Sequence, residues 1–310
     1  MSSVGSNFVK TFPATHWSGG NSDFRPAGTA RLWPVRLNRQ SRVRLAGFTL
    51  IELLVVISIL GILAGLAVPA IKNLAKSNVN AGAARQLLDD VARARQLAVS
   101  HHTTVYMMFV PPNYWLNQST TIQSWPVTTN LSDKQYSGYM FMTLRSAGDQ
   151  PGQGVPRFLA EEWHVLPEGS FIATNKFNAY NFYPGGTAFY IKDQPTGTVY
   201  PIHSFYYTNT LPFPTETNVV DTTVANWQPY IAFNYLGQLT ANGVDGTDQD
   251  EYIPLAQGVV AYAHDVNKAL ILGLPDAAEN PPGNSTNSMY NLIRIDHLTG
   301  RATLLVQKMP

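Results

Sequence analysis

The chain has 310 residues, of which 45% are hydrophobic and only 13% are charged, and its formal net charge is +1. The hydrophobic fraction supports a packed core, and the low charge favours an exported, strand- and loop-rich domain over a cytoplasmic enzyme. The chain has no cysteine, which excludes a disulfide framework.

Residues 1–47 form a basic leader. They hold seven basic residues and a single acid, Asp23, so the rest of the chain is net negative. Positively charged segments beside an apolar run stay on the cytoplasmic side of a membrane. We therefore expect the leader to be cytoplasmic and the chain beyond residue 71 to lie outside. The basic residues form no patch inside a folded domain, so no nucleic-acid partner is expected.

An apolar run follows at residues 48–71. As a helix, its 24 residues would extend about 36 Å, against about 30 Å for the hydrocarbon core of a bilayer. The run is longer than the roughly 7–15 apolar residues of a secretory signal peptide. We predict a transmembrane helix half at 48–71, with a kink at Pro69, whose ring removes a backbone hydrogen bond.

One acid, Glu52, interrupts the apolar run. An ionised group costs on the order of 3 kcal/mol at the centre of a bilayer, and less near its edge, so it is usually kept for a partner. An amino terminus created at Phe48 would supply a positive charge in the same chain or in a neighbouring subunit. The alternative is an interfacial glutamate whose carboxylate reaches the headgroups and has no further role.

The start of the run carries a specific motif. Residues 47–56, GFTLIELLVV, closely resemble the prepilin signal of type IV pilins and of type II secretion pseudopilins. The resemblance implies cleavage after Gly47 by a prepilin peptidase, N-methylation of Phe48, and Glu52 as the assembly carboxylate. It also implies an inner-membrane protein with a cytoplasmic N-terminus and a periplasmic C-terminal domain. Such a protein would join other pseudopilins or pilins on an inner-membrane assembly platform and enter a pseudopilus.

The helical pattern continues over residues 72–101, which we interpret as a soluble amphipathic helix half. Apolar residues recur at three- and four-residue steps and form one stripe, which would pack on a globular domain. The stripe contains Ala84, Leu87, Leu88, Val91, Ala94 and Ala98. The charged residues Asp89, Asp90, Arg93 and Arg95 are predicted to lie off it.

The remainder, residues 102–310, is expected to be a β-rich globular domain in the periplasm. Runs of β-branched and aromatic residues predict strands at 103–110, 139–144, 170–173, 181–183, 188–192, 203–207, 230–234, 258–263 and 292–295. Long loops rich in Gly, Pro, Asn and Ser are predicted at 111–137, 146–157, 212–226 and 275–287. The predicted class is α+β: a long N-terminal helix packed on an antiparallel sheet, as in pilins.

Several segments resemble one subgroup, the GspH/FimT-type minor pseudopilins. The passage from the helix at 90–100 into TTV at 103–105 looks like their junction with the first strand. The stretch WHVLPEG at 163–169 resembles their LP-x-G turn. FNYLG at 233–237 and DHLTGR at 296–301 resemble their late strands and final hairpin turn. An ordinary hairpin turn explains Thr299 and Gly300 equally well.

The search for chemistry gives one weak metal candidate. No H-x-x-x-H, H-E-x-x-H, G-x-S-x-G, Walker A or G-x-G-x-x-G pattern occurs. The acids Asp245, Asp248, Asp250 and Glu251 lie close together in a glycine-containing stretch. Carboxylates on such a loop suit calcium, but their spacing does not match an EF-hand, and a solvated turn is the simpler interpretation. We expect no other cofactor.

The leading hypothesis is therefore a non-enzymatic minor pseudopilin of a type II secretion system. The second is a minor pilin of a type IV pilus that serves adhesion or DNA uptake. A third is a binding module that uses the pilin helix only as a tether. Its aromatic residues could line a carbohydrate-binding face, although alternation along strands would place about half of these rings in the core.

Overall fold

The fold was analysed in a computed structural model. It describes residues 48–116, 118–145, 149, 154–160, 162–179, 185–193, 196–214, 222–286 and 291–306; within this part, the side chains of residues 66–78 are not described. The chain divides into two compact units, residues 1–57 and 58–310. The second unit contains all of the strands.

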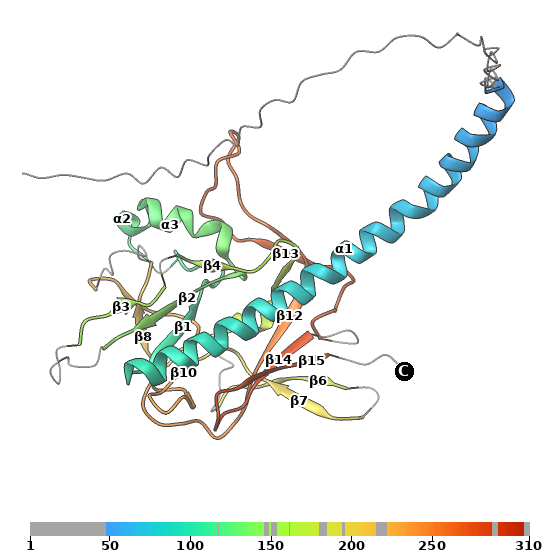
Figure 1. The fold of residues 1–310 in the computed structure, drawn as a ribbon. Coiled ribbons are helices and arrows are strands. Elements are labelled where there is room, and N and C mark those ends of the chain that lie inside the picture. The colour runs from blue at the N-terminus through green and yellow to red at the C-terminus, as the bar shows by residue number, and fades with distance from the viewer. Residues whose placement is uncertain are drawn as a thin grey trace, which may run out of the picture. The chain divides into compact units, whose positions relative to one another are not determined.

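The main helix, α1, spans Leu50–His101 (Figure 1). Its predicted apolar stripe is confirmed: Ala84, Leu87, Val91, Ala94 and Ala98 are buried. These side chains recur at three- and four-residue steps because that spacing places them on one face of a helix. The helix assignment continues through Pro69, and the predicted kink there stays a prediction.

The end of α1 is a Schellman turn. The Thr103 N–H donates to the Ala98 carbonyl at 3.2 Å, and the His102 N–H donates to the Val99 carbonyl at 3.4 Å. His102 has a φ of 50°, the left-handed conformation that this turn requires at its first residue past the helix. The turn ends the helix and leads within three residues into the first strand, which begins at Val105.

The first sheet is antiparallel and has the order β11-β10-β1-β2-β3, with β4 also paired to β2. Met107 in β1 lies opposite Phe141 on one side and Ile231 on the other. Its strands are β1 (Val105–Phe109), β2 (Gly138–Thr143), β3 (Arg157–Phe158), β4 (His164–Val165), β10 (Tyr230–Phe233) and β11 (Leu239–Thr240).

The second sheet has the order β13-β12-β14-β15, and β5 also pairs with β12, at Leu255–Gln257. Two separate hairpins, β6–β7 and β8–β9, complete the strands. The bounds are β5 (Ser170–Ile172), β6 (Phe189–Lys192), β7 (Val199–Ile202), β8 (Thr210–Pro212), β9 (Ala225–Trp227), β12 (Glu251–Ala261), β13 (Asp276–Glu279), β14 (Asn291–Ile295) and β15 (Ala302–Val306).

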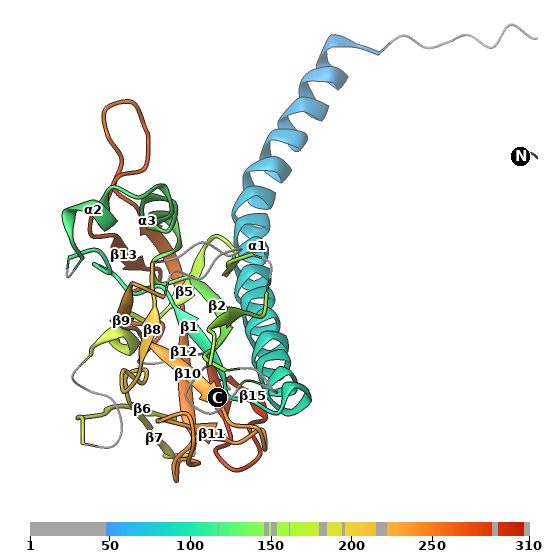
Figure 2. The ribbon, with the colours of Figure 1, turned by 90° about the vertical axis from the view of Figure 1, so that its left-hand side faces the viewer.

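The main core lies between α1 and the two sheets, as Figure 2 shows from the side. It contains Leu87 and Val91 from the helix, Phe141 and Phe233 from the first sheet, and Ile253 from the second. A second core covers the opposite face of the first sheet. Strands β1 and β2 are buried at every position, because both of their faces are covered, and they therefore show no polar alternation.

The structure confirms the α+β class, with a helix followed by antiparallel sheets. It corrects several boundaries. The predicted loop at 111–137 contains α2 (Thr120–Gln123), α3 (Pro126–Asn130) and the 3-10 helix η1 (Ser132–Lys134). The predicted strand at 203–207 forms isolated bridge positions at Ser204 and Tyr206 and no continuous strand, and Tyr206 bridges to Tyr230. The predicted strand at 258–263 is the end of β12, and the predicted strand at 181–183 lies outside the described residues.

Candidate functional site

The first turn of α1 holds the motif residues that the structure describes. The Thr49 hydroxyl accepts a hydrogen bond from the Glu52 backbone N–H at 3.2 Å, and the Leu53 N–H donates to the Thr49 carbonyl at 3.1 Å. Thr49 is thus the N-cap of the helix, and the Thr-x-x-Glu spacing is that of a capping box. The local structure of the motif follows directly from its sequence.

The Glu52 carboxylate lies in this first turn and is exposed. A negative charge at this position is favoured by the positive end of the helix dipole. Within the part of the chain that the structure describes, no hydrogen bond or ion pair to this carboxylate occurs. Gly47 lies outside the described residues, and Phe48 is 73% exposed.

The apolar side chains that follow are also exposed. Every large hydrophobic residue from Phe48 to Leu63 is exposed, with Leu50 the most so at 88%. A continuous apolar surface of this kind normally marks a contact with protein or lipid. Within the residues that the structure describes, no helical stretch combines the length and hydropathy that crossing a membrane requires. The predicted span at 48–71 is only partly described, because the side chains of residues 66–71 are not described.

A polar clamp joins the C-terminal half of α1 to the first sheet. It is formed by Gln86 and Asp90 of α1 with Tyr139 of β2 and His164 of β4. The Asp90 carboxylate accepts from the Tyr139 hydroxyl at 2.6 Å and lies 2.9 Å from His164 Nδ1. Gln86 donates to the Tyr139 hydroxyl and to the Val165 carbonyl, both at 3.0 Å. Burial, together with the bond to Asp90, holds the pKa of Tyr139 above its usual value, so its hydroxyl remains a donor.

This clamp corrects the prediction that Asp90 lies off the packed stripe. Asp90 is only 8% exposed, whereas Asp89 faces solvent. The helical period alone places Asp90 at the border of the stripe, three residues after Leu87. Nothing in the local sequence indicates that a tyrosine from β2 and a histidine from β4 meet it there.

Two of the four acids proposed for calcium, Glu251 and Asp250, pair with cationic groups. The buried Glu251 carboxylate contacts the ammonium group of Lys176, which also donates to the His203 carbonyl at 2.6 Å and lies 4.6 Å above the Phe205 ring centre. Burial lowers the pKa of Lys176 and raises that of Glu251, and the attraction between the two groups opposes both shifts. This buried pair was not predicted, because its two members are 75 positions apart in the sequence.

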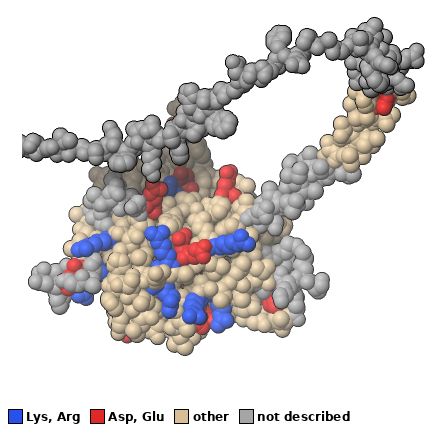
Figure 3. Space-filling model, viewed as in Figure 1, with Lys and Arg blue, Asp and Glu red and all other residues tan. Residues whose placement is uncertain are grey.

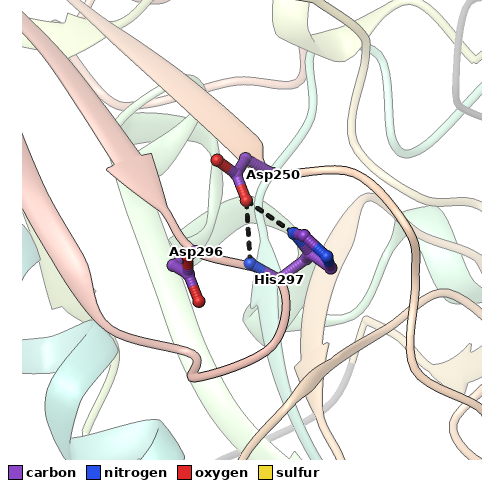
Figure 4. A group of neighbouring side chains, drawn as sticks. All are labelled: Asp250, Asp296 and His297. Carbon is purple, nitrogen blue, oxygen red and sulfur yellow. Dashed lines mark hydrogen bonds and ion pairs between the residues drawn. The ribbon is translucent and has the colours of Figure 1, made fainter.

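Asp250 is the second of these acids that pairs with a cationic group. One oxygen accepts from the His297 backbone N–H at 3.0 Å and lies 2.8 Å from His297 Nδ1, as Figure 4 shows. The other accepts from Arg294 Nε at 2.7 Å. Partial burial would raise the pKa of Asp250, but the bonds from His297 and Arg294 outweigh it and hold the pKa below its usual value.

One group of possible metal ligands therefore occurs among the described residues, and its geometry is that of an ion-pair cluster. Asp250, Asp296 and His297 each offer one possible ligand atom, and these three atoms lie within 4.8 Å of one another. Asp296 accepts from the Thr299 N–H and hydroxyl, both at 2.7 Å, and points away from Asp250 in Figure 4. A calcium ion would have to displace Arg294 and His297 from Asp250. Asp245 bonds to Asn242 at 3.1 Å, and Asp248 is exposed, so the four acids form no common cage.

The charged surface is mixed in sign. Figure 3 shows Lys and Arg beside Asp and Glu on the face that α1 crosses. Arg95 on this face donates from Nε to the Thr299 carbonyl at 2.6 Å, which ties the end of α1 to the β14–β15 turn.

Comparison with known proteins identifies the N-terminal motif. Residues 44–68 match the family model described as the prokaryotic N-terminal methylation motif. No curated protein and no solved structure matches the chain at a significant level. The matched segment contains Gly47, Phe48 and Glu52, and it ends just before Pro69. The match supports a type IV pilin-like or pseudopilin protein, which confirms the resemblance at that level.

Proposed function

We propose that this chain is a minor pseudopilin of a type II secretion system. A prepilin peptidase would cleave it between Gly47 and Phe48, and Phe48 would then be N-methylated. The helix half at 48–71 would hold the protein in the inner membrane until it joins the pseudopilus. The observation that carries this proposal is the methylation-motif match at 44–68, which overlaps the capped start of α1.

The geometry of the first turn supports a role for Glu52 in assembly. Cleavage before Phe48 would place a new amino group one residue ahead of the N-cap, at the position where the helix begins. The Glu52 backbone N–H is already bonded to Thr49, so the carboxylate is the part of Glu52 that remains for a partner. An N-methylated amine of a neighbouring subunit is the charge that such a carboxylate would pair with inside an apolar filament core.

The exposed apolar surface from Phe48 to Leu63 supports the same proposal. Packing against lipid before assembly and against other pilin-like helices afterwards would cover it in both states. The second half of α1 is fixed to its own domain by the apolar stripe and by Asp90, so the domain would be carried along as one unit. The role is structural, and the proposal includes no reaction and no cofactor.

The finer assignment to the GspH/FimT-type group rests on the resemblance of local segments. The segments that carry the resemblance include the junction between α1 and β1, the turn at Gly169 and the hairpin turn at Gly300, and both glycines have a positive φ. Gly300 has a φ of 63°, and a Cβ there would lie 2.1 Å from the Gly237 carbonyl. The turn and the loop after β10 thus pack on each other through two glycines.

An in-frame deletion in the native host tests the assignment. We expect proteins of the secretion pathway to accumulate in the periplasm, and a plasmid copy of the wild-type gene to restore their export. Normal export with loss of surface pili or of DNA uptake would instead identify a minor pilin. If export and pili were both unchanged, the chain would be a binding module tethered by a pilin helix.

A further inference from the structure

A groove of about 660 Å³ opens beside the outer half of β12. It lies where β4, β13 and α1 approach the end of this strand (Figure 1). Its walls include Val79 from α1, Val165 from β4, the turn at Gly169, and Val259 and Val260 from β12. All of these residues belong to the same compact unit.

The groove contains an apolar strand face that the core does not cover. Val259 lies on the same face of β12 as Ile253 and Leu255, because alternate residues of a strand point the same way. Ile253 and Leu255 are buried in the main core, whereas Val259 is 66% exposed. The strand therefore extends beyond its own core and presents apolar surface to the groove.

The same part of β12 has one open edge. The Asn280 N–H donates to the Gln257 carbonyl at 2.8 Å, so in an antiparallel ladder Gln257, Val259 and Ala261 bond toward β13. The Gly258 N–H donates to the Gly169 carbonyl on the other side at 3.0 Å. Val260, two residues after Gly258, must direct its N–H and carbonyl to that other side as well.

Strand β5 ends before it can reach Val260. By the register of β5 and β12, the residue opposite Val260 would be Pro167. The carbonyl of Pro167 instead accepts from the Ser170 N–H at 3.1 Å, in a tight turn that Gly169 makes possible with a φ of 92°. The backbone groups of Val260 thus face the groove without a strand beside them.

The charge of the groove restricts what can fill it. Its described lining includes two carboxylates, Asp133 and Glu168, and no lysine or arginine. The Lys134 ammonium lies 2.6 Å from the Asp133 carboxylate and neutralises it. Glu168 is exposed, and among the described side chains no cationic group pairs with it. A strand edge open among the described residues, an apolar face and this exposed acid together fit an extended peptide with small apolar and basic side chains.

We propose that this groove, lined by Val260 and Glu168, binds an extended basic peptide segment of another protein as an added strand on β12. Two backbone hydrogen bonds to Val260 would fix the peptide, and Glu168 would pair with one of its basic side chains. This site is independent of N-terminal processing, because no residue of the methylation motif contributes to it.

Val260→Pro provides a selective test. Proline removes the N–H that faces the groove, yet the ladder to β13 uses the residues on either side of Val260. Pro254 already occupies the same side of β12, and its carbonyl accepts from Ala173 at 3.0 Å, so the strand tolerates a proline there. Val260→Ala is the matched control, because it shortens the side chain and keeps the N–H.

The full-length protein in phospholipid nanodiscs would be titrated into fluorescein-labelled acetyl-Lys-Val-Thr-Val-Lys-amide, and fluorescence anisotropy recorded. We expect saturable binding, about fivefold weaker for Val260→Pro and little changed for Val260→Ala, since a lost backbone hydrogen bond costs on the order of 1 kcal/mol. A peptide N-methylated at its central residue should lose the same affinity on the wild-type protein, and Glu-Val-Thr-Val-Glu should bind more weakly.

The absence of saturable binding to the wild type would overturn the proposal. So would equal binding by Val260→Pro, or equal binding of the N-methylated peptide, which needs no variant to fold. Tighter binding of an amphipathic helical peptide would also overturn it, since the groove would then accept a helix and not a strand.

Discussion

The Tyr139 hydroxyl of β2 donates a 2.6 Å hydrogen bond to the Asp90 carboxylate of α1 within the buried interface between helix and sheet. Apolar packing holds the helix on the sheet but specifies its rotation and axial position only loosely. A directional bond between a buried acid and a buried tyrosine fixes both. The globular domain is therefore held at one orientation on the helix that we propose carries it into a filament.

Replacing Asp90 by Ala should destabilise the domain by about 1–3 kcal/mol, because it leaves the buried Tyr139 hydroxyl without its acceptor. Urea unfolding measured at neutral pH gives this value. Asp89→Ala is the matched control: its side chain is exposed, and we expect a change of no more than about 0.5 kcal/mol. Equal effects of the two variants would show that the clamp contributes nothing.

The buried Lys176–Glu251 pair should behave differently from a surface ion pair. Lys176→Met leaves Glu251 buried without a countercharge and should cost about 3–5 kcal/mol. The double variant Lys176→Met with Glu251→Leu should recover most of that loss, since two apolar side chains need no countercharge. Thermal and urea unfolding of both proteins test this, and a double variant less stable than the single one would contradict it.

Asp250 should make the free energy of unfolding of the domain depend on pH in the acidic range. Its folded-state pKa is held below the usual value by His297 and Arg294, against the opposing effect of burial. Its contribution is therefore fully present above the unfolded pKa of about 4 and is lost as the pH falls through the folded pKa. Asp250→Asn should reduce the loss of unfolding free energy between about pH 5 and pH 3. An unchanged slope would contradict the assignment.

The roles of Glu52 and Thr49 can be separated by mutation. Glu52→Ala keeps the backbone N–H that Thr49 caps, so helix initiation and cleavage should persist while incorporation into filaments falls. Thr49→Val removes the cap and should cost about 1 kcal/mol of helix stability but retain the carboxylate. Immunoblots of sheared filament and membrane fractions measure both effects. Normal incorporation of Glu52→Ala would show that the carboxylate has no assembly role.

Addition of calcium should leave the thermal midpoint unchanged within experimental error. Asp250 and Glu251 already bond to cationic groups, and a bound ion would have to displace Arg294 or Lys176. The same measurement after treatment with EDTA is the control. A calcium-dependent rise in the midpoint that is lost in Asp250→Asn would contradict this account.

The features predicted well from the sequence are those encoded locally. The apolar stripe from Ala84 to Ala98 repeats at helical spacing. Strands β1 and β2 are predictable because their apolar and aromatic residues are consecutive. The position of Gly300 in the last hairpin is likewise a local property of the turn between β14 and β15.

The features that were missed depend on contacts between distant segments. Asp90 is polar in sequence, and only the arrival of Tyr139 and His164 makes its burial favourable. Lys176 and Glu251 are 75 positions apart, so neither predicts the other. The helices α2 and α3 were not predicted because they have only four and five residues and each contains two threonines, which have low helix propensity. The outer half of β12 was predicted, but its open edge depends on where β5 ends.

Mass spectrometry of the N-terminal peptide from the membrane fraction tests the central claim most directly. We expect the wild type to begin at N-methylated Phe48, and Gly47→Ala to retain the residues before it. That result would place a new amine beside Glu52 and leave the apolar run in the mature protein. An intact leader on the wild type, in a host that processes its other prepilins, would contradict the account and leave a simple tethered domain.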